Sequence, residues 1–114
     1  MNMTDVISYI YNVKNPSSKI FNREIPTLVE INSKWNGGSH LMDIIINKIE
    51  QEYREEINIV RIDFETHKEL FDYLGINRAP AFLFINNGNI VEIIKETVSK
   101  KNLEKILYNL LSGS

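Results

Sequence analysis

The most informative segment of the sequence is LVEINSKWNGGSH, residues 28–40. Residues 27–31 follow a proline and form a short, mostly apolar run. Such a run is typical of a central β-strand. Glu30 places one acidic side chain inside that strand. Residues 32–39 are rich in turn-forming types. The segment therefore predicts a strand that ends in a turn.

Helical spacing follows this turn. Leu41, Ile44, Ile45 and Ile49 recur at the intervals of one helix face, with polar residues at other positions. The apolar stripe of such a helix faces the protein core. We therefore expect a helix over residues 39–53.

The rest of the chain continues the alternation of strand and helix patterns. We expect a strand at 57–64 with Arg61 inside it and a short helix at 68–74 that stops at Gly75. After Ala79-Pro80 we expect a strand at 81–85, a hairpin turn at 86–89 and a strand at 90–95. The last element is a helix capped by Ser99, with an apolar stripe from Leu103 to Leu111. A helix joins the first two strands, which makes them parallel, and the hairpin adds an antiparallel pair. This order predicts an α/β fold with a central mixed sheet and helices on both faces.

The first 25 residues are harder to interpret. Val6, Ile10 and Val13 recur at helical spacing after Thr4, which favours a helix that ends before Asn15-Pro16. The β-branched and aromatic residues in the same run also permit a strand. We expect residues 1–25 to pack on a single domain formed by residues 26–114.

Composition restricts the classes of function. The 114 residues include 13 Lys and Arg against 15 Asp and Glu, so the formal net charge is −2, and neither nucleic acid nor a membrane is an expected partner. No apolar run predicts a membrane span or a signal peptide, and we expect a cytoplasmic location. Cysteine is absent, which excludes a disulfide, a thiolate nucleophile and a thiolate metal site within the chain. We expect no metal and no cofactor.

The motifs between residues 26 and 111 resemble the thioredoxin family. In that family a strand with a buried acid leads to Trp-Cys-Gly-Pro-Cys-Lys at a helix N-terminus. Here Glu30 leads, without a gap, to Trp35-Asn36-Gly37-Gly38-Ser39-His40. The buried lysine, helix end, cis-proline and Asn-Gly hairpin of the family are matched by Arg61, Leu74-Gly75-Ile76, Ala79-Pro80 and Asn87-Gly88. The resemblance implies a thioredoxin-like fold with Pro80 in cis and a buried ion pair between Glu30 and Arg61.

The two cysteines of the family motif are replaced by Asn36 and Ser39. Thiol–disulfide exchange requires a thiolate, which a carboxamide or a hydroxyl cannot supply. We therefore expect a redox-inactive protein-binding, chaperone-like or adaptor module rather than an enzyme. The resemblance implies that the backbone before the cis-proline can pair with an extended peptide of the partner. The expected binding surface comprises Trp35, Asn36, Gly37, Gly38, Ser39, His40, Ala79 and Pro80.

Two other functions fit the same residues. The N–H groups of residues 37–40 open a helix and can hold an anion or a glutathione-like ligand, or support an enzyme in which Ser39 and His40 act as nucleophile and base. Neighbouring helix residues point about 100° apart, which places that pair poorly. The third possibility is a structural subunit that contacts its complex through another face. The sequence leaves the identity of the partner and the oligomeric state open.

Overall fold

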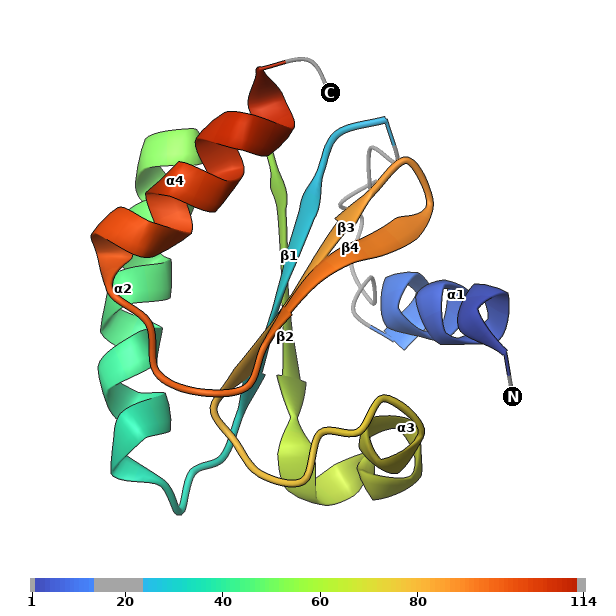
Figure 1. The fold of residues 1–114 in the computed structure, drawn as a ribbon. Coiled ribbons are helices and arrows are strands. Elements are labelled where there is room, and N and C mark those ends of the chain that lie inside the picture. Colours follow the sequence, from blue (N-terminus) through green and yellow to red (C-terminus); the bar gives the residue numbers. More distant parts are fainter. Residues whose placement is uncertain (1, 14–23, 113–114) are drawn as a thin grey trace.

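The computed structural model describes residues 2–13 and 24–112 (Figure 1). Its centre is a four-stranded mixed sheet with the strand order β2-β1-β3-β4. β1 (Thr27–Asn32) is parallel to β2 (Asn58–Asp63) and antiparallel to β3 (Ala81–Asn86). β4 (Asn89–Ile94) is antiparallel to β3. The predicted parallel pair and the predicted hairpin are both confirmed.

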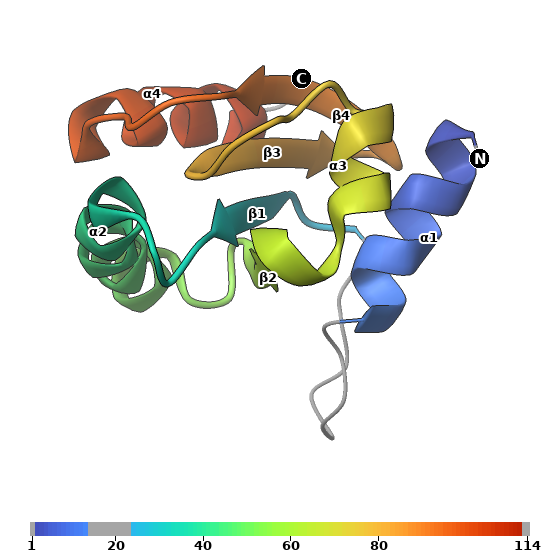
Figure 2. The ribbon, with the colours of Figure 1, turned by 90° about the horizontal axis from the view of Figure 1, so that it is seen from below.

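Helices cover both faces of the sheet, as Figure 2 shows. α2 (Gly37–Tyr53) and α4 (Lys100–Leu111) lie on one face, whereas α1 (Met3–Val13) and α3 (Lys68–Tyr73) lie on the other. The short 3-10 helix η1 (Phe64–Thr66) joins β2 to α3. A buried apolar cluster fills each side of the sheet. The α/β architecture expected from the sequence is therefore confirmed.

Residues 3–13 of the N-terminal segment form a helix and not a strand. Val6 and Ile10 of α1 are fully buried and belong to the same apolar cluster as Val29 of β1. A hydrogen bond of 3.3 Å between the hydroxyls of Tyr11 and Thr27 also connects α1 to β1. The predicted end of this helix before Asn15-Pro16 lies outside the described residues.

Local chemistry determines where several elements start and stop. Asn36 caps α2 and Ser99 caps α4, each through a side-chain oxygen that accepts a backbone N–H. The turn between β3 and β4 contains Asn87 and Gly88, with φ of 53° and 78°. A two-residue hairpin turn favours these two residue types because both tolerate positive φ. The cap at Ser99 and the Asn-Gly turn agree with the sequence-based predictions, whereas α2 begins at Gly37, two residues before the expected start.

One prediction for α2 is wrong. The apolar spacing assigned Leu41 and Ile44 to the core-facing stripe, yet they are 54% and 56% exposed. The buried residues of α2 are Ser39, Met42, Ile46 and Ile49. Residues 44–46 are three consecutive isoleucines, which fit more than one helix face. Packing against the sheet and α4 selects Ile46 for the core.

Candidate functional site

Asn36 connects the two halves of the site predicted from the sequence. Its Oδ1 accepts the backbone N–H of Ser39 at 3.1 Å and so caps α2. Its Nδ2 donates to the backbone carbonyl of Ala79, also at 3.1 Å. The peptide bond between Ala79 and Pro80 is cis. The residue at the first cysteine position therefore holds the loop before α2 against the chain that enters β3.

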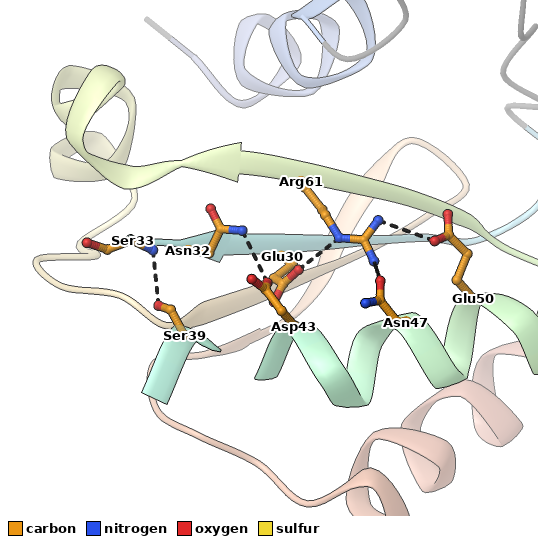
Figure 3. A network of polar contacts seen from close by, with 8 residues as sticks. All are labelled: Glu30, Asn32, Ser33, Ser39, Asp43, Asn47, Glu50 and Arg61. Atoms are coloured by element: carbon orange, nitrogen blue, oxygen red, sulfur yellow. Dashed lines mark hydrogen bonds and ion pairs between the residues drawn. The ribbon is translucent and has the colours of Figure 1, made fainter. Parts of the chain in front are cut away.

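Ser39, at the second cysteine position, is a structural residue. Its side chain is 1% exposed, and its Oγ accepts the backbone N–H of Ser33 at 3.0 Å (Figure 3). A buried hydroxyl that is already hydrogen-bonded cannot reach a ligand at the surface. The geometry therefore gives no support to Ser39 as an anion ligand or as a nucleophile.

Trp35 projects from a loop that several hydrogen bonds hold in place. Its side chain is 78% exposed, more than any other large hydrophobic side chain among the described residues. Its backbone N–H donates to Ser33 Oγ at 3.2 Å, and Lys34 Nζ lies 5.1 Å from the centre of its ring. The exposed ring of His40 contacts the backbone carbonyl of Lys34 through Nε2 at 2.9 Å. His40 therefore binds the loop and does not face Ser39.

The two glycines at the start of α2 differ in their surroundings. A Cβ atom at Gly37 would have no heavy atom within 4 Å. A Cβ atom at Gly38 would lie 3.0 Å from Asn36 Oδ1 and 3.1 Å from Thr97 Cγ2. It would also lie 3.4 Å from Pro80 Cδ. Gly38 therefore permits the close approach of α2 to the cis-proline, and Gly37 is free to accept a larger side chain.

The eight predicted site residues lie together but differ in exposure. Trp35, Gly37 and His40 are exposed, and Asn36 and Gly38 are half-buried. The buried members are Ser39, Ala79 and Pro80. These three residues lie under the surface, so their side chains are not available to a partner. We use the name former active-site surface for the five that are at least partly exposed.

Glu30 lies below this surface and is fully buried. Burial, followed by hydrogen bonding and charge repulsion from Asp43, raises the pKa of Glu30 from 4.5 to about 8, although Arg61 acts in the opposite direction. Among the described residues no donor reaches Glu30 Oε2. A proton on Glu30 turns Oε2 into a donor towards the Asp43 carboxylate. At neutral pH, Glu30 is therefore mostly a neutral acid.

The expected buried ion pair needs correction. Arg61 Nε does lie 3.2 Å from Glu30 Oε1, but the Arg61 side chain is 30% exposed. Its guanidinium also contacts Glu50 Oε1 at 3.3 Å and Asn47 Oδ1 at 2.6 Å (Figure 3). Only the acid is buried, because β2 is an edge strand and the arginine reaches along α2 towards solvent. With Glu30 protonated, the contact is a hydrogen bond between a cation and a neutral acid.

The polar side of α2 contributes residues to this region that were not predicted from the sequence. Asp43, Asn47 and Glu50 all point towards Glu30 or Arg61 (Figure 3). Asn32 donates to Asp43 Oδ1 at 3.3 Å and so connects this group to the end of β1. The intervals of four and three residues between the α2 members place them on one helix face. That spacing is the signal that could have identified them.

Two features are absent from the described parts of the chain, a metal-ligating cluster of side chains and a membrane-spanning helix. Within residues 2–13 and 24–112, no group of three or more His, Asp or Glu side chains could hold a metal ion. No helix in the same ranges is long and apolar enough to cross a membrane.

Comparison with known proteins places these observations in context. The family model described as Thioredoxin matches residues 8–109. The chain is 24% identical over 94 residues to the thioredoxin of Porphyra purpurea, which covers 82% of this chain and 88% of the relative. It is 22% identical over 111 residues to the mitochondrial thioredoxin of Rattus norvegicus, which covers 95% of this chain and 67% of the relative.

A solved structure shows the same fold. The structure of a malarial protein superposes with a TM-score of 0.70 at 15% sequence identity, covering 76% of this chain and 98% of the other. At this low identity the likeness concerns the architecture alone. This chain therefore shares its overall fold with a solved protein of very different sequence.

Proposed function

Because this chain belongs to the thioredoxin family yet contains no cysteine, we propose that it binds a partner protein through the former active-site surface and does not exchange disulfides. Thiol–disulfide exchange proceeds by attack of a thiolate on a disulfide sulfur. The chain supplies an amide at one cysteine position and a buried hydroxyl at the other. What remains for a partner is a shaped surface with an exposed aromatic side chain.

The observation that carries this proposal is the 78% exposure of Trp35 on a loop that is already ordered. Tryptophan is enriched among the residues that contribute most to binding at protein interfaces. Binding to a flexible loop would cost free energy to order it. Here the contacts of Ser33 with Trp35 and of His40 with Lys34 hold the loop before a partner arrives. The ring can therefore be buried with little loss of backbone entropy.

The hydrogen bonds favour docking on Trp35 over the addition of an extended peptide beside the cis-proline. A peptide that pairs with the backbone before the proline uses the Ala79 carbonyl as an acceptor. Asn36 Nδ2 already donates to that carbonyl at 3.1 Å. A peptide at this position would share an acceptor that already has an internal donor, whereas a partner on the Trp35 ring breaks no hydrogen bond and displaces only water and the Lys34 ammonium.

The proposal is tested by affinity capture with variants that change only the surface. The purified chain captures proteins from an extract of its source cells, and the affinity of each purified partner is then measured for four forms of the chain. Trp35→Ala removes the aromatic ring, and Gly37→Arg adds a bulky side chain where a Cβ meets no atom. Tyr108→Ala is the matched control, because Tyr108 is 69% exposed on α4.

We expect Trp35→Ala to weaken partner binding about 30-fold, the effect of losing about 2 kcal/mol at an interface hot spot. Gly37→Arg should weaken binding through steric hindrance, and Tyr108→Ala should leave it unchanged. If every captured partner binds the wild type, Trp35→Ala and Gly37→Arg equally well, the former active-site surface is not the binding site.

A further inference from the structure

α2 carries a second apolar face that the core does not use. Leu41 and Ile44 lie one turn apart and are 54% and 56% exposed. The same helix already buries Met42, Ile46 and Ile49 in the cluster between α2, α4 and the sheet. A surface helix needs one apolar stripe for folding. The exposed pair is therefore not required to hold α2 on the sheet.

The loop that carries Trp35 leads directly into the start of this helix. The His40 ring contacts the backbone carbonyl of Lys34 at 2.9 Å, which holds the Trp35 loop against the first turn of α2. Leu41 follows His40 directly, and Ile44 follows one turn later. We use the name outer strip for Trp35, Leu41 and Ile44. Each of the three is more than half exposed, and Leu41 and Ile44 are neighbours on one helix face because they lie three residues apart.

Positive charge borders the outer strip at both ends. Lys34 Nζ lies over the Trp35 ring, and Lys48 is exposed one turn beyond Ile44 on α2. Among the described residues, no carboxylate oxygen lies within 4 Å of either lysine amine. The nearby Asp43 is turned inward, where it accepts a hydrogen bond from Asn32 (Figure 3). The strip therefore has exposed apolar side chains between two lysines that form no ion pair within the described residues. Two nearby acidic side chains are already engaged, because Glu52 pairs with Lys100 and Glu65 accepts from Ser33 Oγ.

We propose that the outer strip binds an amphipathic helix of a partner protein, in which apolar side chains one turn apart are flanked by Asp or Glu. The inference rests on the proposed function and extends its binding surface from Trp35 along α2. The apolar side chains of the partner pack along Leu41 and Ile44, as in helix-in-groove recognition. Its carboxylates meet Lys34 and Lys48, which matches charge across the interface.

The structure favours this occupant over two others. An extended strand pairs through free backbone groups, but the backbone of α2 is hydrogen-bonded within the helix. A second copy of this chain, docked antiparallel, would bring Lys34 of one copy towards Lys48 of the other, and like charges repel. An acidic amphipathic helix has neither disadvantage.

The test uses the full chain and a defined peptide library. Alanine-rich helical peptides of 18 residues, randomised at positions i, i+3, i+4 and i+7, are displayed and selected on the immobilised chain. Selected peptides are then synthesised and titrated, with fluorescence as the readout, since Trp35 is the sole tryptophan. The variants are Leu41→Ser/Ile44→Ser and Lys34→Glu/Lys48→Glu. The control is Val91→Ser, because Val91 is 48% exposed on β4.

We expect the selected peptides to combine apolar residues with Asp or Glu, and to bind each double variant at least tenfold more weakly than the control. Circular dichroism verifies that the variants remain folded, since all four altered side chains are exposed. Three results would overturn the inference: no selected peptide, enrichment of Lys or Arg, or equal binding to Leu41→Ser/Ile44→Ser. Self-association of the wild type that this variant loses would assign the strip to a second copy and also overturn it.

The outcome is separable from that of the proposed function. A captured partner that loses affinity for Trp35→Ala but binds Leu41→Ser/Ile44→Ser normally overturns the inference and leaves the proposed function in place. A partner that is insensitive to both Trp35→Ala and Gly37→Arg refutes the proposed function, whatever the peptides do.

Discussion

Replacement of Glu30 by glutamine should remove most of the pH dependence of stability around neutral pH. The pKa of Glu30 is about 8 in the folded protein and 4.5 as the reference value. Between these values the native state binds a proton that the unfolded state has released. The free energy of unfolding therefore decreases as pH rises through this window. The stabilising effect of the proton is fully present below pH 4.5 and is lost once the pH exceeds about 8.

The magnitude follows from the same shift. Each pKa unit corresponds to about 1.4 kcal/mol, so the rise from 4.5 to about 8 represents on the order of 5 kcal/mol over the whole window. Glu30 is fully buried, so solvent does not screen this contribution directly. Near neutral pH, the wild type should lose about 1.4 kcal/mol per pH unit from this one group.

Urea unfolding followed by far-ultraviolet circular dichroism at pH 5.5, 6.5 and 7.5 measures this slope. Glu30→Gln cannot ionise, and its amide can donate to Asp43 in place of the acid proton. The slope of the variant should therefore be lower than that of the wild type by about 1.4 kcal/mol per pH unit. Glu92→Gln, an exposed change on β4, should retain the wild-type slope. Equal slopes for the wild type and Glu30→Gln would refute a protonated Glu30 at neutral pH.

Three further predictions concern the same region. Asp43→Asn removes a charge that helps to raise the pKa of Glu30, so the loss of stability should still begin near pH 4.5 but should be complete at a lower pH than in the wild type. Carboxyl-carbon NMR of Glu30 measures the lower pKa, and an unchanged titration would contradict the prediction. Asn36→Ala removes a helix cap and the hydrogen bond to the cis-proline segment and should cost about 2 kcal/mol in urea unfolding. Asn36→Asp keeps the cap oxygen and should cost less; an equal loss would show that the cap is unimportant. Gly38→Ala should destabilise the protein by about 1–3 kcal/mol through overpacking, whereas Gly37→Ala should be neutral or stabilising. Thermal unfolding compares the two variants, and a larger loss of stability for Gly37→Ala would contradict the packing around these two glycines.

Much of the fold could be predicted because its signals are local. The cap at Ser99, the stop at Gly75 and the turn at Asn87-Gly88 each depend on residues a few positions apart. The crossover helix and the hairpin then define the sheet directions. The positions that form the candidate site could be predicted for the same reason. The residues around Trp35 have the local sequence pattern of a strand, a turn and the start of a helix.

The roles of the site residues could not be predicted to the same extent. Local spacing assigned Leu41 and Ile44 to the core, but packing with α4 buries their neighbours instead. The place of Ser39 at a helix start makes it a candidate ligand by sequence, but its buried hydroxyl accepts the backbone N–H of Ser33. Arg61 was expected to be buried, but the edge position of β2 leaves it partly exposed. In each case the deciding neighbour belongs to a different element of the fold.

The sequence by itself determined that this chain has no sulfur nucleophile, because chemical identity does not depend on folding. It also determined the order of helices and strands, since those preferences act over a few neighbouring residues. Only the tertiary structure decided that Asn36 bonds to Ala79, that Asp43 faces the acid on β1, and that α2 has a second apolar side. Hydrogen bonding, burial and charge depend on which distant segments meet in space, and that arrangement is a property of the whole folded chain.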